Sequence, residues 1–213
     1  FICNHSDHNG RYAFNQQPFI GLWNLSCLAQ ALLPLASKED LKAALDRYTP
    51  LCEGWYMELM RAKVGLVETK EEDASLIQDL LALMHLHHVD YTNFFRALGL
   101  FQAGSESPNE PLRDFFLDRE SFDKWARRYE DRLREEGSRD NDRLVRMNRV
   151  NPKYVLRNYL AQTAIEKAQQ KDFSEIDRLL TLLQNPYSDQ PGMDVYAAPP
   201  PNWGKHLSVS CSS

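Results

Sequence analysis

The sequence lacks an apolar stretch long enough to cross a membrane, and it has few cysteines. None of its apolar runs approaches the roughly 18 residues of a transmembrane helix, so a membrane-spanning helix is excluded as an interpretation. The four cysteines are too scattered for a disulfide scaffold. We interpret Cys27 and Cys52, which lie in apolar helical contexts, as small buried side chains, and Cys3 and Cys211 as loop residues.

Neither a large excess of one charge nor a phosphate-binding glycine loop is present. The net charge of −5 argues against a surface for nucleic acids. No Gly-x-Gly occurs among the nine glycines, and no Ser-His-Asp order or paired carboxylates stand out. The residues by themselves therefore assign no catalytic, cofactor-binding or metal-binding role.

Two histidine clusters contain residue types that bind metals. His5 and His8 lie beside Cys3, but no second pair of ligands follows at the usual spacing, so we interpret them as hydrogen-bonded loop residues. His85 and His88 fall at the end of a predicted helix, where imidazolium groups favour the negative end of the helix dipole. A structural cap is the preferred interpretation there, with a zinc site as the alternative.

Helical periodicity dominates the sequence, and strand signals are almost absent, so we predict a mostly α protein. The stretch 19–33 is apolar nearly all round, which predicts a deeply buried helix. Ser37 opens a capping box for the apolar stripe that continues to Leu59. Pro50 lies inside that stripe and predicts that its helix is kinked or split, and Gly65 is a plausible stop.

Further helices follow, and the last segment is extended. Amphipathic spacing predicts helices over 71–86 and over 90–98, the second capped by Asp90, and one that carries Phe173 to Leu183. Between them a charged helix that ends at Gly137 is predicted to have its apolar residues inward: Phe122, Trp125, Tyr129 and Leu133. The stretch 102–110 is predicted to be the most mobile loop. From Asn185 onward, prolines and glycines exclude a regular helix, and we expect an extended tail that its aromatic residues hold in place.

The pair Asn151-Pro152 predicts a helix start, with a capping side chain followed by a proline in the first turn. We expect this helix to be central to the fold. Its predicted buried residues are Val155, Leu156, Tyr159 and Leu160.

An arginine-rich region covers residues 119–149. Basic and acidic residues alternate there, which is typical of a solvated, ion-paired helix surface. Arg143, Arg146 and Arg149 are spaced by three residues, which places them on one side of a helix. The alternative interpretation of these three arginines is that they bind a phosphate or an acidic partner surface.

Several segments in the same order resemble the selenoprotein O family over essentially the whole chain. They are Cys-Asn-His-Ser-Asp-x-x-Gly-Arg-Tyr at 3–12, Gln-Pro at 17–18 with Leu-Trp-Asn-Leu at 22–25, Asn-Pro-Lys at 151–153 with Arg-Asn at 157–158, Pro-Pro-x-Trp at 200–203 and Ser-Cys-Ser-Ser at 210–213.

The resemblance implies a protein-kinase-like fold and a protein adenylyltransferase, which uses ATP and Mg or Mn to move AMP onto Ser, Thr or Tyr hydroxyls of protein substrates. Family catalytic motifs would lie upstream of Phe1, so this chain would be a C-terminal part that lacks the nucleotide and metal site and is inactive alone. Residues 1–184 would be a helical C-lobe portion, residues 1–18 an activation-segment-like loop, and residues 185–213 a tail packed on that portion.

The implied partners are the missing N-terminal part of the same protein and the protein substrates. Neither nucleic acid nor membrane is expected as a partner. The implied location is the cytoplasm in a bacterium or the mitochondrion in a eukaryote. A stand-alone helical interaction module without enzymatic activity is the alternative function.

The resemblance also singles out four residues near the two ends of the chain. Asp7 and Arg11 lie in the activation-segment-like loop, either as a local structural pair or as groups that touch the active cleft. Cys211 matches a position where some family members carry selenocysteine, and both Cys3 and Cys211 lie in polar loops. We therefore predict that Cys3 and Cys211 form a reversible disulfide.

Overall fold

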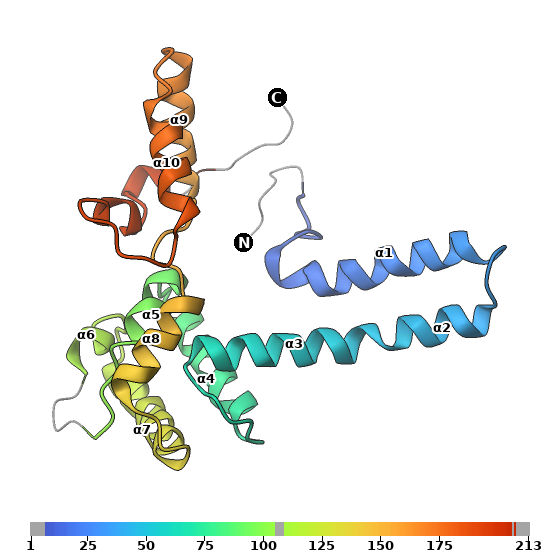
Figure 1. The fold of residues 1–213 in the computed structure, drawn as a ribbon, viewed down its shortest axis with the longest axis horizontal. Coiled ribbons are helices and arrows are strands. Elements are labelled where there is room, and N and C mark those ends of the chain that lie inside the picture. The colour runs from blue at the N-terminus through green and yellow to red at the C-terminus, as the bar shows by residue number, and fades with distance from the viewer. Residues whose placement is uncertain (1–6, 105–108, 206, 208–213) are drawn as a thin grey trace. The chain divides into compact units, whose positions relative to one another are not determined.

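The computed structural model describes residues 7–104, 109–205 and 207, and these residues form helices and turns without a strand (Figure 1). The prediction of a mostly α chain is confirmed. Contacts group the chain into two units, Phe1–Met57 with Asn202–Ser213, and Glu58–Pro201. Within the described residues, no helix combines the length and apolar character needed to cross a membrane.

The first unit is built on a pair of helices joined by a short turn. Its elements are η1 (Phe14–Gln16), α1 (Gln17–Leu32), α2 (Lys38–Asp46), the first part of α3 (Tyr48–Lys63) and η3 (Asn202–Gly204). The Ser37 hydroxyl accepts a hydrogen bond from the Asp40 N–H at 3.1 Å, so the predicted cap of α2 is confirmed. The apolar stripe is split at Arg47, and Pro50 lies in the first turn of α3, where its missing N–H costs nothing.

The expectation that α1 is deeply buried is wrong for this unit. Ile20 is the buried residue of α1, whereas Trp23, Leu25 and Leu28 are 49%, 39% and 54% exposed. The main neighbours of α1 are η1 and α2, and they cannot cover a helix that is apolar on all sides. For the same reason Cys27 is exposed, and Cys52 in α3 is only half-buried, in contrast to the burial that we predicted.

The second unit contains the main core. Its elements are the rest of α3, then α4 (Asp73–Leu86), α5 (Tyr91–Leu98), α6 (Glu110–Arg113), α7 (Arg119–Glu135), α8 (Asp140–Val150), α9 (Asn158–Gln169), α10 (Ser174–Gln184) and η2 (Asp194–Ala197). Figure 1 shows how these helices follow one another. The Asp90 carboxylate accepts a hydrogen bond from the Asn93 N–H at 2.9 Å, which confirms the predicted start of α5.

Helices α4 and α7 pack together through the apolar face that the sequence predicts for α7. Phe122, Trp125, Tyr129 and Leu133 are all buried, and the Trp125 and Tyr129 rings stack at 4.9 Å between centroids. The Trp125 Nε1–H donates to the Leu76 carbonyl at 2.9 Å, so the indole meets its polar requirement inside the core. The predicted inward face is therefore confirmed.

Two arginines of the predicted charged surface are buried, which corrects that expectation. Arg132 is 5% exposed and donates to the carboxylates of Asp73 at 2.8 Å and Glu136 at 3.0 Å. Arg143 is fully buried, pairs with Asp140 at 2.9 Å and donates to the Phe101 carbonyl. All three nitrogens of Arg132 donate, to Asp73, Glu136 and the Glu68 carbonyl, so its burial is compensated. In Arg143 it is Nη2 that meets Asp140 and the Phe101 carbonyl, whereas Nε and Nη1 are buried without a hydrogen-bond partner among the described residues. Because Arg143 is inaccessible to a partner, it cannot join Arg146 and Arg149 in binding a phosphate or an acidic surface.

The predicted helix start at Asn151-Pro152 is wrong, because α9 begins at Asn158. Asn151 instead follows the last residue of α8 and is fully buried. Its Oδ1 accepts from Lys63 Nζ at 2.9 Å, and its Nδ2 donates to the Lys63 carbonyl at 2.8 Å. Both polar groups of the side chain bind Lys63, so neither caps a helix start.

Helices α9 and α10 pack around a small cluster of Leu160, Ala164 and Leu179. Of the four residues predicted to be buried in this region, Leu160 is buried, Val155 and Tyr159 are half-buried, and Leu156 is 56% exposed. In the tail, the Tyr196 hydroxyl donates to Glu175 at 2.7 Å and packs beside the cluster. The division into residues 1–184 and 185–213 stays a prediction.

Candidate functional site

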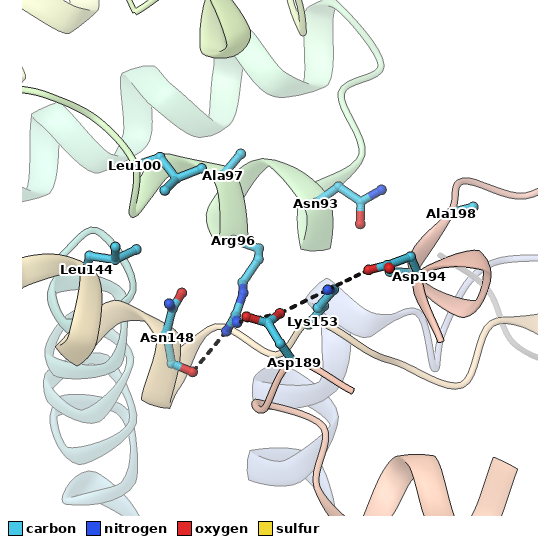
Figure 2. Close-up of a pocket in the computed structure, with 11 residues that line it drawn as sticks. Asn93, Arg96, Ala97, Leu100, Leu144, Asn148, Lys153, Asp189, Asp194 and Ala198 are labelled. Carbon is cyan, nitrogen blue, oxygen red and sulfur yellow. Dashed lines mark hydrogen bonds and ion pairs between the residues drawn. The ribbon is translucent and has the colours of Figure 1, made fainter. Parts of the chain in front are cut away.

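A cavity of about 550 Å³ lies in the second unit, between α5, the end of α8 and the segment 189–198 (Figure 2). Apolar side chains line part of it, and two cations and two carboxylates supply its charged groups. The lining residues include Arg96, Asn148, Lys153, Asp189 and Asp194. In Figure 2, Arg96 of α5 and Lys153 both extend toward Asp189.

Arg96 joins three parts of the chain that are distant in sequence. Its Nη1 donates to the carbonyls of Asn148 at 3.1 Å, Asn151 at 3.2 Å and Tyr187 at 3.0 Å, and its Nη2 lies 3.6 Å from the Asp189 carboxylate. Carbonyls near the end of α8 lack hydrogen-bond partners within the helix. The Arg96 guanidinium supplies the missing donors, and its positive charge interacts favourably with the negative end of the helix dipole. Arg96 therefore connects α5 with α8 and the tail.

Lys153 binds the tail from the other side of the cavity. Its Nζ lies 2.7 Å from Asp194 and 2.9 Å from Asp189. The hydrogen bonds with Asp194 and then Asp189 raise the pKa of Lys153 above its usual value, and the bond from Lys153 lowers the pKa of Asp189. Two carboxylates of the tail thus neutralise the two cations of the cavity.

A second layer of charged contacts lies at the start of α5. Arg157 donates through Nη1 and Nη2 to the two carboxylate oxygens of Asp90, at 2.6 and 3.0 Å. Burial acts to raise the pKa of Asp90, but the hydrogen bonds from Arg157 and the Asn93 N–H lower it below its usual value. Lys63 lies 4.9 Å from the Phe95 ring centroid, and burial lowers its pKa.

These contacts involve three residues of the Asn-Pro-Lys and Arg-Asn segments. Asn151, Lys153 and Arg157 hold α3, the tail and the start of α5, respectively. Each of these cations is paired, and none of the described cavity residues is a nucleophile next to a base. The arrangement fixes the position of backbone segments, and we assign it no catalytic step.

No group of three or more His, Cys, Asp or Glu side chains in the described part of the chain could hold a metal ion. Helix α4 ends at Leu86, and the His88 N–H donates to the His85 carbonyl at 3.2 Å. These two histidines therefore lie at the helix end, as the preferred interpretation states. The described residues therefore supply no acidic ligand set for the metal of a metal-linked nucleotide.

Asp7 and Arg11, the predicted loop residues, are neighbours in the first unit. The Asp7 carboxylate accepts from the backbone N–H groups of Arg11 at 2.9 Å and Tyr12 at 2.8 Å. The Arg11 guanidinium lies 4.5 Å from the Trp23 ring centroid, a cation–π distance. Cys3 and Cys211 lie outside the described residues, as does His5, so the disulfide stays a prediction.

Three residues of the cavity, Arg96, Asp189 and Asp194, were not singled out from the sequence. The signal for Arg96 is that it stands as the one cation inside the predicted helix 90–98, where an unpaired charge is costly to bury. Asp189 and Asp194 lie in a segment without periodicity, so no spacing pointed to them. Their partners became visible only in the tertiary structure.

Comparison with known proteins gives two findings. The model of a family described as "Protein adenylyltransferase SelO" matches residues 1–184. Relatives named "Protein nucleotidyltransferase YdiU" are 56% identical in Myxococcus xanthus and 55% identical in Thioalkalivibrio sulfidiphilus, over 100% of this chain and 44% of each relative. One in Pseudomonas fluorescens is 50% identical over the same shares. The chain thus spans less than half the length of these curated relatives.

Proposed function

Because the chain belongs to the protein adenylyltransferase SelO family, we propose that it is the helical C-terminal part of an enzyme that moves AMP from ATP to Ser, Thr or Tyr hydroxyls of proteins. The observation that carries this proposal is the match of the family over residues 1–184. The 56% identity with a relative named as a protein nucleotidyltransferase supports it.

The proposed reaction balances as a substitution at phosphorus. The acceptor oxygen forms a bond to the α-phosphorus of ATP, and the bond from that phosphorus to the bridging oxygen breaks. Pyrophosphate leaves with the electron pair, and the hydroxyl proton passes to a base. Such transfer needs cations and hydrogen-bond donors at the developing charge. We propose that a part of the protein outside this chain holds the ATP and its Mg or Mn.

The cavity has an architectural role in this proposal. Arg96 and Lys153 hold the tail against α5 and the end of α8, so the helical part is prearranged for its partner segment. We propose that this segment is the N-terminal part of the same protein, that the whole has a kinase-like fold with residues 1–18 as its activation segment, and that it works in the bacterial cytoplasm.

Differential labelling of ATP tests this function. A protein extended to the length of the relatives is expected to transfer label from α-labelled ATP to a protein acceptor, and none from γ-labelled ATP. The 213-residue chain alone is expected to transfer neither label. Transfer of γ-label would identify a kinase, and labelling by the chain alone would contradict the division of roles. No transfer by the extended protein would overturn the proposed activity.

A redox latch between Cys3 and Cys211 is part of the proposal. The oxidant would be a small-molecule disulfide, which accepts two electrons and leaves as two thiols when the thiolates of Cys3 and Cys211 join. The new bond would restrain the activation-segment-like loop. Exposed disulfides of this kind are labile and suited to regulation. Mass mapping of non-reduced peptides after mild oxidation should find the pair linked, and free thiols at both positions would contradict the latch.

One observation favours the alternative of an interaction module. Large apolar side chains of the first unit are exposed, among them Phe19 at 65%, Leu28 at 54% and Trp55 at 62%. Such surfaces mark contacts with other chains. The labelling experiment separates the two functions, because an interaction module has no transfer activity at any length.

A further inference from the structure

Arg11 lies over an exposed aromatic surface of the first unit. Its Cζ is 4.5 Å from the centroid of the Trp23 ring and 5.7 Å from that of Tyr12. Phe19 precedes Trp23 by about one turn of α1, so their side chains share a face of that helix. Tyr12, Phe19 and Trp23 are 50%, 65% and 49% exposed. We call Arg11 and these three residues the aromatic patch.

The side-chain N–H groups of Arg11 are available to an acceptor. Asp7 is the carboxylate nearest to Arg11 in the sequence, but its Oδ1 and Oδ2 accept from the backbone N–H groups of Arg11 and Tyr12. No Lys, Arg, Asp or Glu occurs from Tyr12 to Ser37, so α1 supplies neither a counter-charge nor a second cation. Among the described residues, none accepts a hydrogen bond from the Arg11 guanidinium.

The loop that carries Arg11 is held by its own hydrogen bonds. The Gly10 N–H donates to the Asp7 carbonyl at 3.1 Å, and the Ala13 N–H donates to the Gly10 carbonyl at 3.0 Å. The Gln17 Nε2 donates to the Tyr12 carbonyl at 2.7 Å, which ties the loop to the start of α1. A loop that is ordered in advance loses less conformational entropy when a partner binds.

We propose that the aromatic patch binds a segment of another protein in which an anionic side chain stands between apolar ones. The anionic oxygens receive hydrogen bonds from the Arg11 guanidinium, whose planar fork matches a carboxylate or a phosphate even when the group is stacked on an aromatic ring. The apolar neighbours cover Phe19 and Trp23 and remove them from water. The inference does not depend on the proposed transferase activity.

Charge disfavours other occupants of the aromatic patch. Two copies of the chain that met through this patch about a twofold axis would bring two like charges to one interface. Attachment to an anionic bilayer uses clusters of basic residues, whereas the patch has Arg11 alone and the chain has a net charge of −5. An anionic peptide meets the single cation without either cost.

Fluorescence anisotropy with synthetic peptides tests the patch in the full 213-residue chain without ATP. The probe is a labelled peptide of about eight residues, about 28 Å when extended, with one glutamate between two leucines. Two controls replace the glutamate with glutamine or lysine, and a further peptide carries phosphoserine there. We expect the glutamate peptide to bind roughly tenfold more tightly than the glutamine peptide, and high salt to reduce that preference. The phosphoserine peptide shows which anion binds more tightly.

Matched variants assign the binding to the aromatic patch. Arg11→Gln should abolish the preference for glutamate over glutamine, and Arg11→Lys should restore it only in part, because the planar fork is lost. Trp23→Leu should weaken the probe's binding roughly threefold.

The controls are Arg127→Gln and Trp55→Leu. Arg127 is exposed and forms no ion pair with a described residue, and Trp55 is 62% exposed on α3. Both variants should leave binding within about twofold of the parent chain. Circular dichroism checks that every variant remains helical.

Four results would overturn the inference. Equal binding of the glutamate, glutamine and lysine peptides, or no binding of any, removes the role of Arg11 or the site. Equal weakening by Arg11→Gln and Arg127→Gln shows a nonspecific effect of charge. Binding to anionic vesicles that is lost in Trp23→Leu assigns the patch to a membrane. Loss of peptide binding in a protein extended to the length of the relatives shows that another part of the same protein covers the patch.

Discussion

Individual polar residues in this protein serve two parts of the fold at once. The Asp90 carboxylate accepts from the Asn93 N–H to start α5 and also binds Arg157, which lies 67 residues away in the sequence. A cap of this kind is readable from local sequence, but the second partner is not. The folded protein therefore depends on the charge of Asp90.

Acid should weaken this contact. An aspartate in an unfolded chain has a pKa of about 3.9, and the folded value for Asp90 is lower, so its stabilising effect is present at neutral pH. That effect is lost as the pH falls through the folded pKa. Asp90→Asn should lower the free energy of unfolding at pH 7, and the difference from the parent chain should shrink below about pH 4.

Urea unfolding across pH measures this difference. Asp142→Asn is the control, because Asp142 is exposed and forms no ion pair with a described residue. A constant difference between Asp90→Asn and the parent chain from about pH 7 to about pH 3 would contradict the assignment.

Gly65 is a second residue where conformation and packing act together. Its φ of +79° disfavours other residues, and a Cβ there would lie 2.6 Å from Arg143 Cγ and 2.7 Å from Met147 Sδ. Both neighbours are fully buried, so neither can move aside cheaply. Gly65→Ala should therefore destabilise the chain by about 2 kcal/mol or more.

Gly137→Ala provides the matched control. Gly137 has a φ of +63°, but nothing lies within 4 Å of the position that an added Cβ would occupy, so only the backbone cost of about 1 kcal/mol applies. Chemical denaturation of both variants gives the comparison. Equal losses would show that Arg143 and Met147 yield to the extra methyl group.

At the scale of elements, α9 owes its position to a few buried side chains. Leu160 is 8% exposed and packs with Ala164 and Leu179, whereas Leu156, just before the helix, is 56% exposed. Leu160→Ala should cost roughly 2–5 kcal/mol, and Leu156→Ala less than about 0.5 kcal/mol. A loss below half a kilocalorie for Leu160→Ala, measured by urea unfolding, would mean that α9 is peripheral.

At the scale of the whole molecule, the two units differ in how much they bury. The largest fully buried side chains that the structure describes lie in Glu58–Pro201, whereas α1 buries Ile20 and α2 has no buried residue. Local stability follows the number of buried apolar contacts, so the units should open with different free energies.

Hydrogen exchange on the 213-residue chain measures that difference. Amides of α1 and α2 should exchange roughly tenfold faster or more than those of α4 and α7, because less apolar surface opposes their opening. Comparable protection in all four helices would show that α1 and α2 are covered as well as the main core is.

The sequence by itself determined the helical class, the caps at Ser37 and Asp90, and the buried face of α7, because each depends on residues within one or two turns. It also pointed to Asn151, Lys153 and Arg157, through the family resemblance, without their contacts. Tertiary structure decided the rest of the candidate site. Arg96 reaches the Tyr187 carbonyl across 91 residues, and Lys63 reaches Asn151 across 88.

Contacts over such separations determine whether a polar side chain caps a helix or binds a distant partner. Asn151 has the local pattern of a helix start, yet both of its polar groups bind Lys63. Likewise, α1 has the composition of a core helix, but its burial depends on which neighbours surround it. Local pattern specifies what a segment can form, and the long-range partners select what its side chains do, because buried polar groups must be paired.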